Sequence, residues 1–202
     1  GPFDPLTSTM YEGGAKTEFF SKQLSINLAV YHIEQNNILI NANDPQNPEM
    51  LRQLGQQQSR GVELDVYGQV LSNLSVTANF AANKTFITES ANEAEIGTIL
   101  PNAPRNQGGI WVKYTFLIPA LKGIGIGGGA NYVSSRTTFS NVLTLPSYTV
   151  VDAALYYSID RFKLSANLNN VFNKTHWVGG YDFNRLFPGT PRNFLIGIGY
   201  TF

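Results

Sequence analysis

Four charged side chains have the types that general acid–base catalysis uses, since enzymes pair carboxylates and amines for that chemistry. They are Glu63, Asp65, Lys113 and Asp152, and each alternates with apolar neighbours along the chain. That alternation gathers them on one polar surface, where hydration is the simpler role. No G-x-S-x-G motif and no phosphate-binding glycine loop accompanies them. The sequence therefore predicts no catalytic site, and we expect a protein that is not an enzyme.

The chain has few residues that could bind a metal ion or provide a thiol. The chain has no cysteine, which excludes disulfides, thiolate metal sites and cysteine nucleophiles. Its two histidines, His32 and His176, are far apart in the sequence and have no partner at ligand spacing. Lys plus Arg and Asp plus Glu both total 14, so no excess of basic residues indicates a nucleic-acid partner. We expect no metal site, no cofactor and no nucleic acid.

Aromatic side chains gather in the last long polar segment, together with one arginine. Aromatic rings suit a bulky ligand with apolar faces, and a guanidinium attracts an anionic one. The alternative is a loop that packs only on itself. The candidate ligand-binding set is Trp177, Tyr181, Phe183, Arg185 and Phe187.

The elements that must position these residues alternate apolar and polar side chains with a period of two, the period of a β-strand. No segment of comparable length shows helical spacing, and no apolar run approaches the about 20 residues of a membrane-spanning helix. Nine runs alternate in this way, at 11–19, 24–31, 62–67, 74–83, 110–116, 124–132, 151–159, 162–169 and 194–202.

Short and long connections follow one another strictly between these runs. Outer-membrane barrels have short turns at one rim and long loops at the other, whereas sandwiches show no such alternation. Turns at Ser72 and at 160–161 pair Val62 with Ala82 and Tyr157 with Leu164, so apolar side chains share one face. The short connections lie at 21–22, 71–73, 119–120 and 160–161, and the long ones at 36–57, 88–103, 135–146 and 173–190.

The apolar faces carry no charge at their central positions, where a Lys or Arg in a bilayer would cost about 2–4 kcal/mol. We therefore predict an all-β, antiparallel, transmembrane β-barrel of the bacterial outer membrane. A soluble β-sandwich that serves in binding or adhesion is the alternative. Nine strands alone would leave two unpaired edges in lipid. We therefore expect residues 1–202 to be the C-terminal segment of a larger barrel.

Several motifs resemble those of TonB-dependent siderophore receptors, and of ferrichrome-type receptors in particular. They occur in the family's order and cover nearly the whole chain. The motifs are YEGGAK at 11–16, SRGVELD at 59–65, LPNAPRN at 100–106, SYTVVDA at 147–153, LNNVFNK at 168–174, and PRNF at 191–194 with GYTF at 199–202.

The resemblance implies a plugged barrel of about 22 strands, of which this chain would supply the last nine. The plug and the segment that meets TonB would lie in an N-terminal region outside the chain. It also implies import of a ferric siderophore, with a vitamin or glycan as alternative cargo. In ferrichrome-type receptors, aromatic side chains of the last long loop contact the ligand, which gives that role to the candidate set above.

The resemblance also implies a role for the last strand, because the assembly machinery of outer-membrane barrels reads a C-terminal strand of this type. An ordinary lipid-facing strand would show the same alternation. The implied assembly signal is Phe194, Ile196, Ile198, Tyr200 and the terminal Phe202.

A pair of cations is expected on the outward face. By the register above, Arg60 faces Lys84 at the long-loop rim. Two cations at that level could bridge the phosphate oxygens of lipopolysaccharide. The alternative is a rim pair that is simply solvated.

Overall fold

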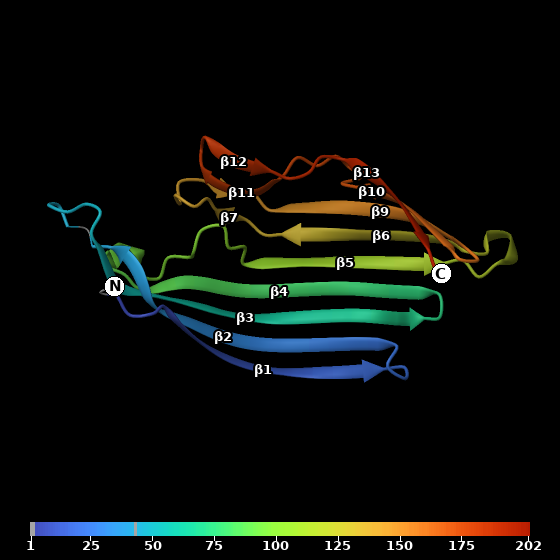
Figure 1. The fold of residues 1–202 in the computed structure, drawn as a ribbon, viewed down its shortest axis with the longest axis horizontal. Helices are drawn as coiled ribbons and strands as arrows, with labels where there is room; N and C mark the ends of the chain where they lie inside the picture. Colours follow the sequence, from blue (N-terminus) through green and yellow to red (C-terminus); the bar gives the residue numbers. More distant parts are fainter. Residues whose placement is uncertain (1–2, 43) are drawn as a thin grey trace.

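One curved antiparallel sheet makes up most of the molecule (Figure 1). The computed structural model describes residues 3–42 and 44–202. The sheet has nine strands in the order β1-β2-β3-β4-β5-β6-β9-β10-β13, and two small hairpins, β7–β8 and β11–β12, lie beside it. The strands are β1 (Thr7–Phe19), β2 (Leu24–Asn41), β3 (Leu51–Leu71), β4 (Leu74–Glu89), β5 (Asn106–Thr115), β6 (Ile124–Val133), β7 (Arg136–Thr137), β8 (Thr144–Leu145), β9 (Tyr148–Ile159), β10 (Phe162–Asn169), β11 (Trp177–Asp182), β12 (Arg185–Pro188) and β13 (Asn193–Tyr200).

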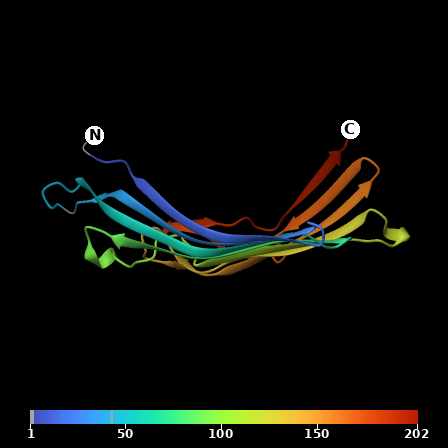
Figure 2. The ribbon, with the colours of Figure 1, turned by 90° about the horizontal axis from the view of Figure 1, so that it is seen from below.

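The sheet bends into an open trough whose two edges are β1 and β13 (Figure 2). In residues 3–42 and 44–202, the helical segments are two short 3₁₀ turns in the connections, Glu93–Glu95 and Pro119–Leu121. No helix of the described residues is long and apolar enough to cross a bilayer. The nine strands of the sheet follow one another in chain order, so this antiparallel meander agrees with the predicted fold.

The registers inferred from the hydrophobic pattern are confirmed. Val62 pairs with Ala82 across β3 and β4, and Tyr157 pairs with Leu164 across β9 and β10. At the β9–β10 turn, Asp160 takes a left-handed φ of 48°, a conformation that Asp and Asn tolerate better than most residues. The predicted short connections at 71–73 and 160–161 are therefore tight turns. The one predicted at 119–120 is longer, because residues 116–123 join β5 to β6 and contain a 3₁₀ turn.

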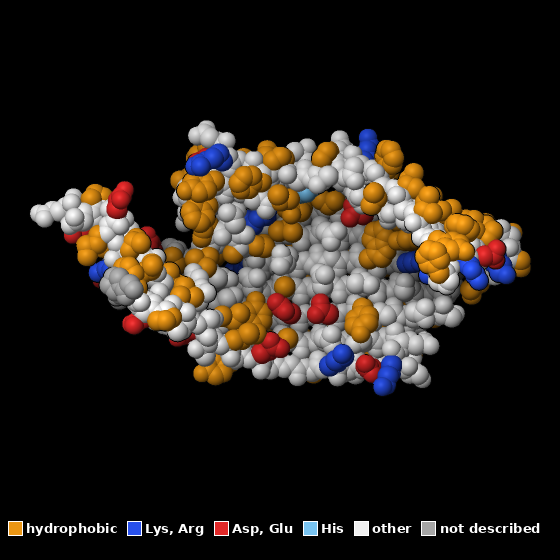
Figure 3. All heavy atoms as spheres, in the orientation of Figure 1, with side chains coloured by type: hydrophobic (Ala, Val, Ile, Leu, Met, Phe, Trp, Pro, Cys, Tyr) orange, Lys and Arg blue, Asp and Glu red, His pale blue; other side chains and the backbone are white. Residues whose placement is uncertain are grey.

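The sheet has no conventional core. Within the described residues, only Leu145 and Ala154 are buried hydrophobic side chains, whereas Leu64 and Phe80 are 37% and 46% exposed. Alternation sends such apolar residues to the convex face. The concave face is mainly polar, with several acidic side chains near its middle (Figure 3). A two-sheet sandwich would bury these apolar residues against each other, so the sandwich alternative is wrong.

The strands are longer at the long-loop end than the sequence pattern predicted. The segment 36–57 was expected to be a connection, yet β2 continues to Asn41 and β3 begins at Leu51. Polar side chains form a cross-strand ladder there: Gln58 Nε2 donates to Glu34 at 3.1 Å, and Gln56 Nε2 donates to Asn36 at 2.6 Å. The pattern missed these extensions because glutamate, glutamine and asparagine side chains take the place of the apolar residues at 34–37 and 56–58.

Candidate functional site

Three long connections meet at one end of the sheet and hold one another in place. Arg136 at the start of β7 donates from Nη2 to the carbonyl of Trp177 at 2.7 Å. The amides of Phe139 and Ser140 donate to the carbonyls of Gly180 and Tyr181 at 3.0 and 2.9 Å. The β7–β8 connection and the β11–β12 hairpin therefore form one ordered assembly.

The third connection joins through a reciprocal pair of hydrogen bonds. Asn102 Nδ2 donates to the carbonyl of Gly180 at 3.0 Å, and its Oδ1 accepts from the Gly180 amide at 3.1 Å. The Asn102 amide also donates to the Thr137 carbonyl at 2.8 Å. Asn102 thereby satisfies backbone groups of two other connections.

Arg136 is the buried centre of this assembly. It is only 6% exposed, and its guanidinium carbon lies 5.7 Å from the centroid of the Tyr148 ring. Its Nη1 has no hydrogen-bond partner among the described residues. Burial of this cation is tolerated because Nη2 is bonded and the ring face stabilises the positive charge.

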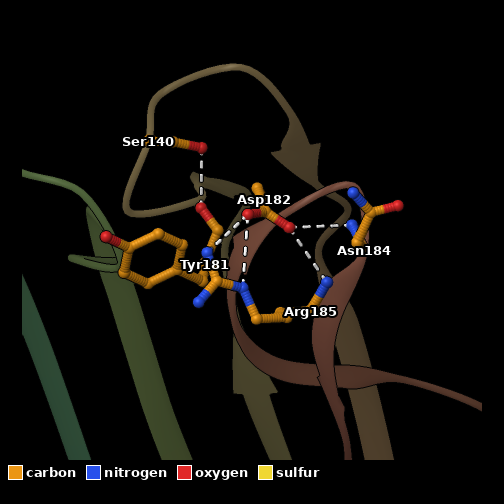
Figure 4. A network of polar contacts seen from close by, with 5 residues as sticks. All are labelled: Ser140, Tyr181, Asp182, Asn184 and Arg185. Atoms are coloured by element: carbon orange, nitrogen blue, oxygen red, sulfur yellow. Dashed lines mark hydrogen bonds and ion pairs between the residues drawn. The ribbon is translucent and has the colours of Figure 1, made fainter.

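The tip of the β11–β12 hairpin is organised by Asp182 (Figure 4). Its carboxylate accepts from Arg185 Nη2 at 2.8 Å and from the Asn184 amide at 2.8 Å. The Arg185 side-chain hydrogen bond, followed by the Asn184 amide, holds the pKa of Asp182 below its ordinary value. The same hydrogen bond raises the pKa of Arg185. The tip therefore presents an ion pair and not a free cation.

Aromatic rings cover this ion pair on one side. The guanidinium carbon of Arg185 lies 3.9 Å from the Tyr181 ring centroid. Tyr181 also stacks on Phe139, with ring centroids 5.1 Å apart and an interplanar angle of 21°. Tyr181 and Arg185 are thus already engaged by neighbours of their own chain.

The remaining members of the predicted ligand-binding set differ in accessibility. Phe183 at the hairpin tip is 66% exposed and Phe187 in β12 is 55% exposed, and neither has a recorded ring partner in the described chain. Trp177 is half-buried, and its carbonyl is held by Arg136. The structure brings all five predicted residues onto one hairpin, with the two phenylalanine rings most available to a ligand.

A polar hollow of about 500 Å³ lies where β9, β10 and β13 meet the connection before β11. His176 packs on Tyr148 with ring centroids 4.5 Å apart, and its Nδ1 contacts the Lys174 carbonyl at 3.0 Å. Asn170 donates from Nδ2 to the carbonyls of Lys174 and Thr190. These bonds close the base of the last long connection, so His176 has a structural role here.

A second hollow, of about 370 Å³, lies in the middle of the sheet. Carboxylate and amide side chains supply the polar part of its lining, and their alternation places them on the concave face. Within the described residues, no group of three His, Asp or Glu side chains could hold a metal ion. The hollow offers hydrogen-bond acceptors and donors to water or to a polar surface. Its polar lining includes Glu63, Asp65, Asn79, Gln107 and Asn131.

Flat aromatic rings line another part of the concave face, over glycines of β6. A Cβ built on Gly127 would lie 2.8 Å from Trp111 Cζ2 and 2.9 Å from Tyr156 Cε2. The ammonium of Lys113 lies 4.3 Å from the Tyr156 ring centroid. The glycine-rich β6 thus leaves room for the Trp111 indole to lie against the wall.

The other predicted residues lie on the convex face. Arg60 pairs with Lys84, as predicted, but the pair is not at a rim, because β3 and β4 both continue beyond it. The sequence pattern did not predict that β3 and β4 extend this far, and so it placed the pair at the rim. The predicted assembly residues form a row along β13 and past its end. All five are exposed: Phe194, Ile196, Ile198, Tyr200 and Phe202.

Sequence reasoning did not identify the residues that hold the connections together. Two of them, Arg136 and Asn102, form hydrogen bonds to residues that are 41 and 78 positions away. The third, Asn170, forms hydrogen bonds across a turn to Lys174 and to the more distant Thr190. The two hairpins inside the predicted loops were also missed. The motif that contains Asn102 was noted, but nothing in its residues indicated a bond to Gly180, 78 positions away.

Comparison with known proteins gives consistent results. A family model described as "TonB dependent receptor-like, beta-barrel" matches residues 1–171. The metal-pseudopaline receptor CntO of Pseudomonas aeruginosa is 31% identical over 199 residues, which cover 97% of this chain and 28% of that receptor. The ferrioxamine B receptor of Salmonella typhimurium is 29% identical over 208 residues, covering 98% of this chain and 29% of the receptor.

Solved structures agree with this fold. The closed form of the ferric-catecholate import receptor Fiu from E. coli superposes with a TM-score of 0.83 at 24% identity, covering 99% of this chain and 28% of that one. The siderophore receptor PiuA from Acinetobacter baumannii gives 0.82 at 21% identity, covering 98% and 29%. The chain thus spans less than a third of each of these proteins.

Proposed function

The chain belongs to the TonB-dependent receptor-like β-barrel family, and we propose that it forms the C-terminal part of a receptor that imports a ferric siderophore. It lies in the bacterial outer membrane, as its family does. The chain then supplies barrel wall and extracellular connections. We further propose that the whole protein is a transporter and not an enzyme, with its plug and TonB-contacting segment in a preceding region.

One observation carries this proposal: an ordered hairpin with two exposed phenylalanine rings lies at the long-connection end of a polar concave wall. Phe183 and Phe187 offer apolar surface, while Tyr181 and Arg185 are held in place by Phe139 and Asp182. A large chelate with apolar and polar faces suits this combination, since aromatic contacts add affinity and a fixed hairpin limits the entropy lost on binding.

The names of the relatives support the same class of ligand. Two relatives of this chain are named as receptors for metal-pseudopaline and ferrioxamine B, and a third as a ferric-pyoverdine receptor. Each name refers to a chelate or its metal complex. Since the metal-pseudopaline receptor is 31% identical, a metal–pseudopaline chelate is the second candidate ligand.

The ion pair at the hairpin tip affects which ligand charge the hairpin would favour. Arg185 is neutralised by Asp182 at 2.8 Å, so the tip has no uncompensated cation for a strongly anionic chelate. We therefore assign the main contacts to Phe183 and Phe187. This refines the expectation that Arg185 attracts an anionic ligand.

The experiment uses the full-length receptor and a panel of ferric siderophores, with metal-pseudopaline as one arm. Calorimetry with purified receptor should identify a bound chelate, and Phe183→Ala with Phe187→Ala should weaken its affinity by about tenfold. Phe172→Ala, an exposed aromatic outside the hairpin, should leave the affinity unchanged. Growth of a receptor-deletion strain under iron starvation, complemented by each variant, should follow the affinities. A receptor that binds no chelate in the panel would contradict the proposal.

A further inference from the structure

Three nitrogen-bearing side chains form one row across adjacent strands of the convex face. His32 in β2 pairs with Arg60 in β3, and Arg60 pairs with Lys84 in β4. Directly opposed residues in an antiparallel pair have Cβ atoms about 4.5–5.5 Å apart, so the three side chains are within reach of one ligand. Tyr11 of β1 pairs with His32 and extends the row.

The row lies where the convex face changes from apolar to polar. On its short-turn side, the next row on this face contains Val30 and Val62, which are 50% and 40% exposed. On its long-connection side, the next row contains Glu34, Gln58 and Phe86. Lipid phosphates lie at the boundary between hydrocarbon and water. The row is therefore at phosphate height if lipid covers the apolar rows.

The two cations lean toward the same aromatic ring. The Arg60 guanidinium carbon lies 5.4 Å and the Lys84 Nζ 5.0 Å from the Phe86 ring centroid. Neither Arg60 nor Lys84 forms an ion pair within the described residues, where the ion pair present joins Asp182 and Arg185. Within the part of the chain that the structure describes, the two positive charges are thus gathered without a protein counterion.

The carboxylate in the adjacent row of this face, that of Glu34, is occupied. Glu34 accepts from Asn36 Nδ2 at 3.2 Å and from Gln58 Nε2 at 3.1 Å. These amides hold Glu34 in the polar ladder of the next row. A multivalent anion would therefore find two cations that no acidic neighbour already pairs.

We propose that Arg60 and Lys84, assisted by His32, bind the phosphate of a lipopolysaccharide molecule in the outer leaflet. This rests on the outer-membrane location of the receptor, but not on which chelate it imports. A lipid is favoured over soluble phosphate because the same face continues into exposed apolar side chains, such as Val62 and Phe80, that acyl chains would cover. Guanidinium and ammonium groups form charge-assisted hydrogen bonds with phosphate oxygens.

The test is native mass spectrometry of full-length receptor purified from outer membranes, which counts retained lipopolysaccharide. Arg60→Gln with Lys84→Gln should reduce the retained fraction by about tenfold. The exchange Arg60→Lys with Lys84→Arg should keep it near wild type. Lys16→Gln with Lys163→Gln removes two charges from the concave face and should change nothing. Equal retention by the Arg60/Lys84 glutamine variant and wild type would overturn the proposal.

A second arm separates lipid from free phosphate. Receptor stripped of lipid and titrated with lipopolysaccharide should bind it, whereas dephosphorylated lipopolysaccharide should bind about tenfold more weakly. Binding of inorganic phosphate alone, with no preference for the phosphorylated lipid, would overturn the lipid assignment. Siderophore affinity measured on the same samples should be unaltered in the glutamine variant. Wild-type receptor that binds lipid but no chelate would contradict only the proposed cargo.

Discussion

Arg136 donates from Nη2 to the Trp177 carbonyl at 2.7 Å, which connects the β7–β8 hairpin to the β11–β12 hairpin across 41 positions of sequence. The bond is buried, since Arg136 is 6% exposed. A charged donor on a buried carbonyl is stronger than a neutral one. The β11–β12 hairpin is therefore held in position by a residue from another connection.

Replacing Arg136 with methionine should loosen the hairpin assembly. The change removes the donor and leaves the Trp177 carbonyl unpaired, which should lower the free energy of local opening by about 1–3 kcal/mol. Hydrogen exchange at the Phe139 and Ser140 amides measures this opening. Arg161→Met at a short turn is the control and should not alter those amides. Unchanged protection in Arg136→Met would show that the other hydrogen bonds suffice.

The tip of the β11–β12 hairpin should respond to acid. The Arg185 side chain lowers the pKa of Asp182 from its ordinary value of 3.8, so folding stabilises the carboxylate. That stabilisation is fully present above pH 3.8 and is lost as the pH falls through the lower folded value. The Asn184 amide resonance, followed by NMR, should therefore titrate below pH 3.8. Its titration should vanish in Asp182→Asn, and a midpoint above 3.8 would contradict the prediction.

Adding a methyl group to Gly127 should displace the Trp111 indole. The new Cβ would lie 2.8 Å from Trp111 Cζ2, and such overpacking costs about 1–3 kcal/mol. We expect Gly127→Ala to increase the quenching of tryptophan fluorescence by acrylamide and to lower stability. Gly128→Ala is the matched control, because a Cβ at position 128 would lie 3.8 Å from its nearest neighbour, the carbonyl oxygen of Asp152. Equal effects of the two substitutions would argue against the close contact.

Deleting Phe202 should lower the abundance of the receptor in the outer membrane. Phe202 is fully exposed, and its ring makes an edge contact with Tyr200 at 5.2 Å. It therefore adds little to the stability of the folded sheet, and a loss of abundance would indicate impaired assembly. Immunoblots of outer-membrane fractions measure this, with Thr201→Ala as the control. Wild-type levels of the truncated receptor would remove Phe202 from the assembly signal.

The sheet was predictable because its signal is local. Alternation in two strands and the turn between them determines the register, as with Val62 opposite Ala82 and Tyr157 opposite Leu164. A slip by one residue would turn every apolar side chain to the polar face. The same logic placed Arg60 opposite Lys84 on the convex side.

The connections were less predictable because their structure depends on contacts between distant segments. The ladder of Gln58 with Glu34 looks polar and irregular in sequence, yet it extends two strands. The bonds from Asn102 to Gly180 and from Arg136 to Trp177 exist only once the sheet has brought three connections together. The hairpin was predicted as a set of residues, and its ion pair and stacking were not.

The central claim is that hydrocarbon covers the convex face and water fills the concave side. Leu64 and Asp65 are adjacent in β3 but point to opposite faces, and the chain has no cysteine of its own. Spin labels at Leu64→Cys and Asp65→Cys in the membrane-embedded receptor report this difference through collisions with oxygen and with a water-soluble nickel complex. We predict that the label at 64 meets mainly oxygen and the label at 65 mainly nickel. Equal access of the nickel complex to both labels would contradict the account.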